Sequence, residues 1–449
     1  MRSRRLLGLV AVALSLSLSL FTAACTGPGT GGPGPSTSPS SSPTGPVNLT
    51  IAVYGAQAEV SAYQQIVDSW NARHPLQQLD LVSAEDRDEQ RTLLTAGGTL
   101  PDIFLTSRRE LGWLLEHQAI QPVGELLDER GTNFGDDFQR DAITAFSAQD
   151  DLQCMPWGVS PMVIYYNTDL IDFDLMPLEG LDAPKDHESW TFEQFEAAAE
   201  AAVQEQPGAR GLQIDQTLRG LAPFIYSAGG QVFDNDVTPT MMTFSSDATI
   251  SALEKTLPLL RDPLVTLTDA QLAEATPVEW FERGRLGMIE GFRSLTPELR
   301  AVPGLSFDVM PMPTISGRKT IGDISGLCLS ATAADAGVAA DVLQFFGTPQ
   351  HVAEVARAGY LVPANVAVAE SPDFLQPGQD PEHAEVFNDT VRDIINPPLL
   401  DDYAALESAI APEFAMLFAT GFLDLARVTA AIDAAALPVL ASLQPSPSP

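Results

Sequence analysis

Polar and aromatic side chains come directly or shortly after three short strand-like runs, at 49–53, 79–82 and 102–105. These side chains are Tyr54, Glu85, Asp86, Thr106, Ser107 and Arg108. An aromatic ring offers a flat face to C–H groups, while carboxylate, hydroxyl and guanidinium groups form hydrogen bonds with hydroxyl groups. Residues of these types suit the binding of a small hydroxyl-rich molecule such as a sugar, without a chemical step.

Signatures of enzymes are weak in this sequence. Ser316-Gly-Arg-Lys319 has the S-x-x-K spacing of some acyl-enzymes, but their S-D-N and K-T-G companions are missing. Neither G-x-S-x-G nor G-x-G-x-x-G stands at a predicted strand-to-helix turn. The sequence therefore favours a binding protein over an enzyme. Because 59 residues are Asp or Glu, a pair of glycosidase carboxylates has many candidates, and a secreted carbohydrate-active enzyme is the alternative.

The histidines give no sign of a metal centre. They are His74, His117, His187, His351 and His383. They lack the H-x-x-x-H spacing of zinc sites and have no cysteine neighbours. We therefore expect neither a metal nor any other cofactor.

The elements that must position the polar residues alternate between strands and helices. Strands are predicted at 49–53, 79–82, 102–105, 163–166, 286–289, 307–310 and 326–330. Helices are predicted at 59–73, 89–95, 109–118, 191–199, 246–261, 269–284, 341–346, 349–358, 401–420 and 425–443. This alternation predicts an α/β fold with mostly parallel sheets covered by helices. Ligands of such sheets bind beyond the carboxyl ends of the strands, here after Val53, Val82, Leu105, Ile289 and Ile321.

The length and charge of the chain limit the architectures and the partners that are possible. About 400 residues remain between the two terminal segments described below, which is too many for one ordinary core, so two lobes are expected. The chain holds 24 Lys and Arg against 59 Asp and Glu, a net charge of −35. Such an acidic body repels phosphate backbones, which argues against nucleic acid as a partner.

Eight short motifs follow one another in the same order as in a known family. They are Trp70–Pro75 (W-N-A-R-H-P), Ala96–Phe104 (A-G-G-T-L-P-D-I-F), Met155–Asn167 (M-P-W … V-I-Y-Y-N), Trp190–Phe195 (W-T-F-E-Q-F), Ala228–Phe233 (A-G-G-Q-V-F), Phe281–Phe292 (F-E-R-G-R-L-G-M-I-E-G-F), Met310–Pro313 (M-P-M-P) and Leu361–Ala364 (L-V-P-A). This series resembles the extracellular solute-binding proteins of ABC importers, in the group that includes maltose-binding protein.

The resemblance implies a two-lobed, periplasmic-binding-protein-like fold of type II, in which each lobe is a mixed, mostly parallel sheet flanked by helices and the ligand is held in a cleft between the lobes. The lobes are expected at 47–158 with 292–323 (lobe 1), and at 159–291 with 324–443 (lobe 2). Crossings between the lobes are expected near Val159–Ser160, Gly291–Phe292 and Ile324–Gly326. Closure of the two lobes about these crossings is the expected working motion.

The same resemblance adds candidate binding residues. Those at or near the crossings are Trp157, Phe292, Arg293, Asp323 and Ser325. Tyr403 falls about where the tail helix of this family contributes an aromatic ring. Thr106, in contrast, stands where the family has a Trp, which weakens the expectation of a malto-oligosaccharide.

The implied function is capture of a sugar or oligosaccharide, by a monomer, for an ABC permease in the membrane. A peptide or a polyol is the alternative ligand.

The first 46 residues predict export and attachment to a membrane. A basic start and an apolar run end at Ala23-Ala24, as in a secretory signal over 1–24. Cys25 resembles the acylated cysteine of bacterial lipoproteins, and 25–46 is a tether rich in Gly, Pro and Ser. The expected location is the outer face of the cell membrane, with anchoring through Cys25; an ordinary cleaved signal is the alternative. The Pro- and Ser-rich end, 444–449, is expected to be a disordered tail.

Two cysteines follow Cys25, at Cys154 and Cys328. An even pair in an exported protein permits one disulfide bond. Two buried free thiols are the alternative, and the sequence leaves both open.

Overall fold

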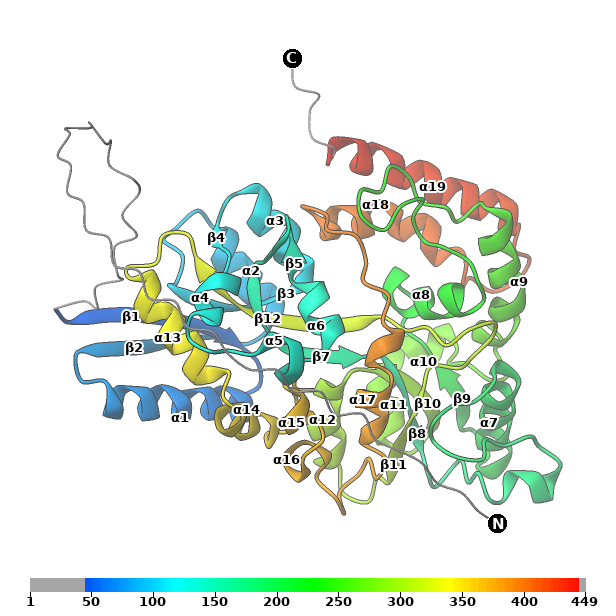
Figure 1. Ribbon diagram of the computed structural model, residues 1–449. Helices are drawn as coiled ribbons and strands as arrows, with labels where there is room; N and C mark the ends of the chain where they lie inside the picture. Colours follow the sequence, from blue (N-terminus) through cyan, green and yellow to red (C-terminus); the bar gives the residue numbers. More distant parts are fainter. Residues whose placement is uncertain (1–44, 444–449) are drawn as a thin grey trace, which may run out of the picture. The chain divides into compact units, whose positions relative to one another are not determined.

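The computed structural model describes residues 45–443 of the chain (Figure 1). The predicted signal over 1–24, Cys25, the tether over 25–46 apart from its last two residues, and the tail over 444–449 lie outside the described residues. Export, acylation and anchoring therefore stay predictions.

Six strands form the first sheet. Its strands are, in order, β2 (Gln77–Ala84), β1 (Val47–Tyr54), β3 (Ile103–Ser107), β12 (Gly322–Ser330) and β4 (Ile120–Gln121), with β7 (Cys154–Pro161) also paired to β12. Strand β1 runs parallel to β2 and β3, whereas β12 runs antiparallel to β3, β4 and β7. Ile51, Ala52 and Val53 are all buried, as in a strand whose sheet is covered on both faces.

Four strands form the second sheet, in the order β11 (Phe307–Pro311), β8 (Val163–Asn167), β10 (Leu286–Gly291) and β9 (Arg210–Gln213). Strand β10 is parallel to β9, and β8 is antiparallel to both of its neighbours. Both sheets are therefore mixed, with fewer parallel pairs than predicted. A short hairpin, β5 (Ser147–Ala148) and β6 (Asp151–Leu152), stands apart.

The longer helices cover the two sheets. They are α1 (Gln57–Arg73), α2 (Arg87–Thr95), α7 (Phe192–Glu205), α8 (Leu218–Ser227), α9 (Asp247–Leu260), α13 (Ala336–Phe346), α14 (Pro349–Ala356), α18 (Tyr403–Ala415) and α19 (Leu425–Ser442). The Thr191 hydroxyl accepts a hydrogen bond from the Gln194 backbone N–H, and the Gln194 side chain reaches back to Thr191. This capping box starts α7 where the sequence predicts a helix.

Short helices fill the connections between these elements. They are α3 (Leu111–Glu116), α4 (Gly124–Asp128), α5 (Phe134–Asp137), α6 (Arg140–Ala145), α10 (Asp269–Glu274), α11 (Pro277–Glu282), α12 (Thr296–Arg300), α15 (Val366–Ala369), α16 (Pro372–Leu375), α17 (Glu385–Asp389), and the single turns η1 (Arg108–Glu110), η2 (Met176–Glu179), η3 (Arg293–Leu295) and η4 (Val391–Asp393). The helix predicted over 269–284 is broken in two, because Thr276 caps a new helix that begins at Pro277.

The hydrophobic core forms two clusters: the first packs on the first sheet and on one face of the second sheet, and the other packs on the opposite face of the second sheet. Ile51, Phe104 and Leu327 belong to the first, and Phe195 and Leu253 to the second. Strand β8 contributes alternate residues to the two clusters, since successive side chains of a strand point to opposite faces. Two cores in one chain agree with the predicted two-lobed architecture.

Strand pairing corrects the predicted division of the chain at two places. Strand β11 lies in 292–323, which we expected in lobe 1, yet it pairs with β8 in the second sheet. Strand β12 lies mostly in 324–443, which we expected in lobe 2, yet it pairs with β3, β4 and β7 in the first sheet. The runs that predict these strands, 307–310 and 326–330, are both short and rich in apolar residues, so their patterns do not tell which sheet each one joins.

Strands β7 and β12 run antiparallel between the two parts of the molecule (Figure 1). Val159 pairs with Ile324, and Ser160 pairs with Asp323, so the first and third predicted crossings lie side by side. Further along the same pair, Cys154 faces Cys328 and the two form a disulfide bond. Of the two alternatives that the sequence leaves open, the structure has the bridge.

Helix α19 is long and apolar enough, by length and composition alone, to cross a membrane. It packs against α18 and α9, and its buried side chains Val428, Ile432, Ala436 and Leu440 belong to the second core cluster. A helix with one face in a core and the other exposed is typical of a folded domain.

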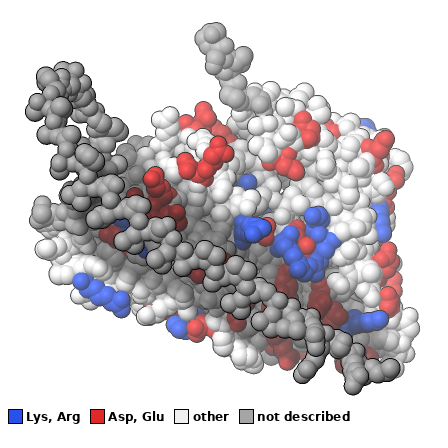
Figure 2. All heavy atoms as spheres, in the orientation of Figure 1, with Lys and Arg blue, Asp and Glu red and all other residues white. Residues whose placement is uncertain are grey.

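Acidic side chains are spread over the face of the molecule in Figure 2, whereas the basic ones gather near its centre and in a few isolated places. This distribution agrees with the net charge of −35. Arg87, Arg109 and Arg219, which belong to the site described next, are among the 24 basic residues of this acidic chain.

Candidate functional site

A hollow opens beyond the carboxyl ends of β1 and β3; we call it the acidic hollow. Its polar lining comprises Tyr54, Glu59, Tyr63, Ser160, Ser294, Asp323, Ser325 and Tyr360. Tyr54 ends β1, and Asp323 and Ser325 lie near the start of β12. The place is the one expected for ligands of sheets with parallel strands.

Glu59, in the first turn of α1, gives the acidic hollow its unusual electrostatics. Burial raises the pKa of Glu59 to about 7, with a further increase from the Asp323 charge and an opposing effect of the hydrogen bond with Tyr63. Burial, and then Asp323, also raises the pKa of Tyr54 well above its ordinary value. The hollow therefore offers a proton-bearing phenol and a carboxyl group that titrates near neutral pH.

Trp157 stands behind the lining of the acidic hollow. It is 2 % exposed, and its indole N–H donates to the Tyr63 hydroxyl over 2.7 Å. The Trp157 and Tyr63 rings also contact each other, with centroids 5.9 Å apart. Trp157 therefore fixes the Tyr63 side chain from within the core.

A second hollow lies between α8, α18 and the start of β12; we call it the apolar hollow. Its apolar lining comprises Leu218, Ala222, Tyr226, Val232, Phe233, Ile321 and Tyr403. Arg109, Arg219 and Glu407 stand at its edge and also line an adjoining open hollow. Aromatic rings beside charged hydrogen-bonding groups suit a ligand with apolar faces and polar edges.

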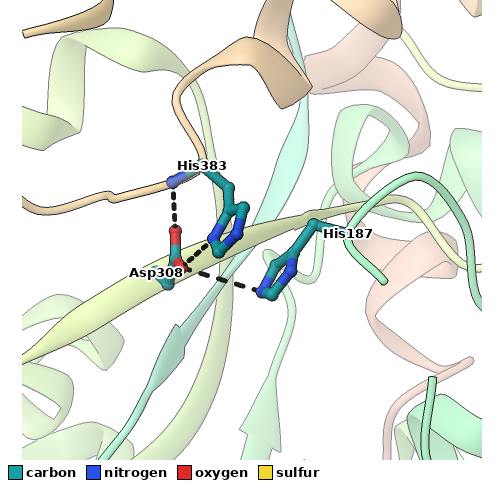
Figure 3. Close-up of side chains that lie close together, drawn as sticks. All are labelled: His187, Asp308 and His383. Carbon is teal, nitrogen blue, oxygen red and sulfur yellow. Dashed lines mark hydrogen bonds and ion pairs between the residues drawn. The ribbon is translucent and has the colours of Figure 1, made fainter. Parts of the chain in front are cut away.

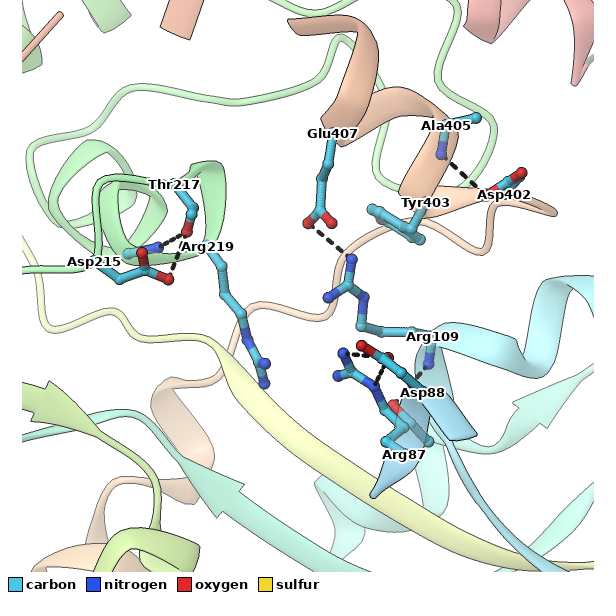
Figure 4. A network of polar contacts seen from close by, with 12 residues as sticks. Arg87, Asp88, Arg109, Asp215, Thr217, Arg219, Asp402, Tyr403, Ala405 and Glu407 are labelled. Carbon is cyan, nitrogen blue, oxygen red and sulfur yellow. Dashed lines mark hydrogen bonds and ion pairs between the residues drawn. The ribbon is translucent and has the colours of Figure 1, made fainter. Parts of the chain in front are cut away.

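Three arginines extend toward the same space (Figure 4), and two of them, Arg109 and Arg219, line the apolar hollow. Each has an acidic partner: Asp88 for Arg87 at 3.3 Å, Glu407 for Arg109 at 2.8 Å, and Asp323 for Arg219 at 3.3 Å. Arg87 and Arg109 come from the part of the chain around the first sheet, and Arg219 comes from α8. Charged groups from both core clusters therefore meet here.

The guanidinium groups also lie over aromatic rings. The Cζ atom of Arg219 is 4.2 Å from the centre of the Phe292 ring, and that of Arg109 is 5.1 Å from the centre of the Tyr403 ring. Burial lowers the pKa of Arg219, and the Asp323 charge opposes this shift. Such stacking holds the flat guanidinium groups in fixed orientations, ready for hydrogen bonds.

The buried carboxyl group of Glu290 on β10 helps to position Arg219. Glu290 Oε1 accepts a hydrogen bond of 2.8 Å from the Asp215 backbone N–H, just before α8 begins. Glu290 Oε2 has no hydrogen-bond partner within residues 45–443. Burial raises the pKa of Glu290 well above its ordinary value. Its contact with Asp215 places the first turn of α8, from which Arg219 extends.

The structure brings five of the predicted binding residues to this site. They are Tyr54, Asp323 and Ser325 in the acidic hollow, Tyr403 in the apolar hollow, and Phe292 under Arg219. The Tyr403 hydroxyl donates to the Pro398 carbonyl over 2.8 Å, so its ring rather than its hydroxyl faces the site.

Five other predicted residues are engaged elsewhere. Thr106 and Ser107 are 2 % exposed within β3, and the Ser107 hydroxyl accepts from the Arg109 N–H. Arg108 donates to the Ala145 and Pro397 carbonyl groups over 3.0 and 2.5 Å, and burial lowers its pKa to about 10. Asp86 caps α2 by accepting from the Glu89 N–H, and Glu85 is exposed beside it. In both loops a neighbouring residue, Arg87 or Arg109, extends to the site instead.

Arg293 is fully buried rather than facing a cleft. Its guanidinium group donates to the Gly359 and Phe374 carbonyl groups and lies over the Phe374 ring. Its backbone N–H donates to the Ser160 hydroxyl. Arg293 therefore joins the second crossing to the segment that carries Tyr360, as a positioning residue.

Sequence reasoning missed several residues of the site, namely Glu59, Tyr63, Arg87, Arg109, Arg219, Glu290, Tyr360 and Glu407. Arg87 and Arg109 are each one residue beyond a predicted residue. Tyr360 directly precedes the Leu361–Ala364 motif, which was a usable signal. Arg219 follows β9, a strand that the sequence analysis did not identify, so the loop after it was not considered.

A family model described as a bacterial extracellular solute-binding protein matches residues 65–384, well over half of the chain. This chain belongs to that family. The match runs from the middle of α1 to the segment just before α17, and it confirms the resemblance drawn from the ordered motifs. No curated protein matches the sequence of this solute-binding protein.

Solved structures share its fold. An ABC substrate-binding protein from Listeria monocytogenes, in complex with cycloalternan, is 18% identical, with a TM-score of 0.74 over 88% of this chain and 99% of its own. A cyclic α-maltosyl-1,6-maltose binding protein from Arthrobacter globiformis is 19% identical, with a TM-score of 0.69 over 89% of this chain and 100% of its own. A maltose-binding periplasmic protein from Listeria monocytogenes, in complex with maltose, is 15% identical, with a TM-score of 0.69 over 89% of this chain and 99% of its own. These likenesses confirm the predicted two-lobed α/β fold of this solute-binding protein.

Proposed function

We propose that this solute-binding protein captures an extracellular sugar or oligosaccharide in the hollows beside β12 and delivers it to an ABC permease. The observation that carries the proposal is the meeting of Arg219, Asp323 and Phe292, which combines a hydrogen-bonding cation, a carboxylate and an aromatic face at one place. Sugars need both kinds of contact, because their hydroxyl edges and C–H faces differ in polarity.

Two further facts support a carbohydrate ligand. The structural relatives named above were solved with cycloalternan and maltose or are named for a cyclic maltosaccharide. Tyr403 and Phe233 add apolar ring surface at the adjoining hollow. A peptide or polyol is the alternative solute, since the same arginines and carboxylates bind amides and other hydroxyl groups.

The test is a binding screen with the purified mature protein. A panel of mono- and oligosaccharides, including cyclic ones, is compared with peptides and polyols by the shift in melting temperature. A ligand present at about 100 times its Kd stabilises the folded state by about 2.7 kcal/mol. The proposal expects such a shift with at least one carbohydrate; shifts with peptides or polyols alone would contradict it.

A matched pair of variants locates the binding. Asp323→Ala removes a carboxylate that is 40% exposed and paired with Arg219, and we expect it to abolish the shift. Asp373→Ala removes one that is 39% exposed and paired with Arg357, outside the hollows, and should leave the shift intact. Equal loss of the melting-temperature shift in both variants would mean that the ligand does not bind at β12.

The same experiment addresses an enzymatic role. A binding protein returns its ligand unchanged, so the sugar recovered after long incubation should have its original mass. Release of smaller sugars by the protein, lost in Glu59→Gln or Asp323→Asn, would favour a carbohydrate-active enzyme instead.

We further propose that the mature protein is a monomer held at the outer face of the membrane by acyl chains on Cys25. Two or more chains supply the stable anchoring that a single chain does not. Cys25→Ser should release the protein into the medium without changing its ligand binding. Retention of this variant in washed membranes would contradict the anchor, and sedimentation of the released form measures its oligomeric state.

A further inference from the structure

Three side chains able to bind a metal meet at the edge of the second sheet, where they line neither hollow. His187 precedes α7, Asp308 lies on β11 and His383 precedes α17 (Figure 3). One ligand atom of each lies within 4.8 Å of those of the other two. The two histidines are far apart in the sequence, so no motif spacing could have indicated that they meet.

Asp308 directs one oxygen to both imidazole rings. Its side chain is 8% exposed, and Oδ1 accepts from the backbone N–H groups of His383 and Val309 over 3.1 and 2.9 Å. Oδ2 lies 2.5 Å from His383 Nδ1 and 3.7 Å from His187 Nε2. The backbone bonds fix the carboxylate, which leaves Oδ2 as the atom available for a shared ligand.

The two imidazole rings stack on each other. Their centroids are 3.5 Å apart and their planes differ by 6°. An ion pair between His383 and Asp308 accounts for those two residues, but it does not account for a second imidazole placed at this distance.

Polar and acidic groups surround the two rings. The Tyr166 hydroxyl lies 2.8 Å from His187 Nε2. Asp186 and Glu382, each beside one of the histidines in the sequence, add negative charge near the rings. A neutral imidazole surrounded by carboxylates is the form that binds metal ions.

We propose that His187, Asp308 and His383 bind a transition-metal dication such as Zn²⁺. The ligand atoms are His187 Nε2, Asp308 Oδ2 and His383 Nδ1, and a water molecule completes the shell. Two imidazoles and one carboxylate are a set that zinc accepts, and cobalt, nickel and copper ions bind the same donors. The Tyr166 hydroxyl, displaced from Nε2, is in place to hydrogen-bond to the metal-bound water.

Metal binding requires the two rings to rotate, because the in-plane lone pairs of parallel rings 3.5 Å apart do not converge on one point. Ligand atoms about 2.0–2.1 Å from a tetrahedral zinc ion lie about 3.3 Å from one another. The 2.5 Å contact between Asp308 and His383 therefore opens, and the 3.7 Å contact between Asp308 and His187 closes. The ion ties the segment before α17 and the segment before α7 to β11, so binding stabilises the fold.

The experiment uses the untagged mature protein, stripped with a chelator and then titrated with ZnCl₂ in a calorimeter. We expect one zinc ion per chain, and a rise in Tm of about 3 °C at a free zinc concentration of about 100 times Kd. Replacement of zinc by Co²⁺ should give the strong visible absorption of a four-coordinate ion. His187→Gln and His383→Gln should each remove the stoichiometric binding and the cobalt spectrum.

His117→Gln is the matched control, because His117 is a half-exposed histidine with Asp401 4.0 Å away and should leave zinc binding unchanged. Circular dichroism of each variant establishes that it is folded. The proposal is overturned if the stripped wild-type protein binds no stoichiometric zinc, or if the doubly substituted His187→Gln/His383→Gln protein binds it as the wild type does.

Discussion

The guanidinium group of Arg219 and the carboxylate of Asp323 form an ion pair of 3.3 Å between α8 and β12. Helix α8 belongs to the second core cluster and β12 to the first sheet, so the pair joins the two parts of the fold at the candidate site. Arg219 also lies over Phe292 at the second predicted crossing. A ligand bound here contacts a cation, a carboxylate and a ring whose positions depend on one another.

Arg219→Ala should weaken ligand binding by about tenfold or more, because removal of one member of a partly buried ion pair leaves the other without its partner. The Kd of the carbohydrate that gives the largest thermal shift, measured by calorimetry, checks this. Arg283→Ala is the control, since Arg283 also pairs with an acid, Glu274, and lies over a ring, Trp280, but lines neither hollow. A Kd that Arg219→Ala leaves unchanged would exclude Arg219 from the binding site.

The candidate site was predictable where a side chain directly follows a strand with a clear pattern. Tyr54 is of this kind, whereas Asp323 was predicted from the family resemblance, and both line the acidic hollow. Prediction failed by a single residue in two loops, because Asp86 and Ser107 are used as helix caps and their neighbours extend to the site. Helix caps and binding groups are the same polar residue types, so composition alone does not separate them.

The series of elements and the two lobes were predictable, but the sheet that each strand joins was not. Strands β11 and β12 are consecutive, and which sheet each joins depends on pairing partners more than a hundred residues away in sequence. The role of Arg293 was hidden for a related reason. A buried arginine and a cleft arginine look alike in sequence, and the carbonyl groups of Gly359 and Phe374 that bury it come from a distant segment.

Neighbouring arginines should respond differently to substitution. Arg108→Ala leaves the Ala145 and Pro397 carbonyl groups without their donor, and should lower the free energy of unfolding by about 1–3 kcal/mol with little change in Kd. Arg109→Ala should weaken ligand binding and change stability by less, because its partner Glu407 remains 36% exposed to water. Denaturant unfolding and calorimetry on both variants check this. The opposite pattern would mean that Arg108 is the ligand-binding residue.

Loss of the Cys154–Cys328 bridge should lower the stability of the protein. The bridge closes a loop with a sequence separation of 174, and removal of such a link typically costs about 2–4 kcal/mol. The double variant Cys154→Ala/Cys328→Ala should therefore unfold at a lower denaturant concentration than the oxidised protein. Mass spectrometry after alkylation, with and without reductant, establishes the redox state. Two alkylated thiols in protein isolated from the cell exterior would contradict the bridge.

Glu59 should make stability depend on pH between about 4.5 and 7. Its pKa is 4.5 in an ordinary setting and about 7 in the folded protein, so in this window the folded state holds a proton that the unfolded state has lost. Stability from this group is complete below pH 4.5 and is lost as the pH rises through 7. Glu59→Gln removes the effect while keeping a hydrogen-bonding side chain of similar shape. The Tm of this variant minus that of the wild type should therefore grow from pH 4.5 to pH 7 and then stay constant.

Glu193→Gln provides a control in which the effect on stability should depend on pH in the opposite direction. Hydrogen bonds from its own backbone and from Thr191 lower the pKa of Glu193, so its charge stabilises the fold above its unfolded pKa and this contribution is lost as the pH falls. The Tm of Glu193→Gln should thus fall below that of the wild type at neutral pH and approach it in acid.

If the Tm of Glu59→Gln instead follows that of the wild type at every pH from 4.5 to 8, the Glu59 carboxyl group is already ionised in the folded protein. The acidic hollow would then hold a permanent negative charge at Glu59, and a ligand hydroxyl group would find an ionised acceptor there throughout this pH range.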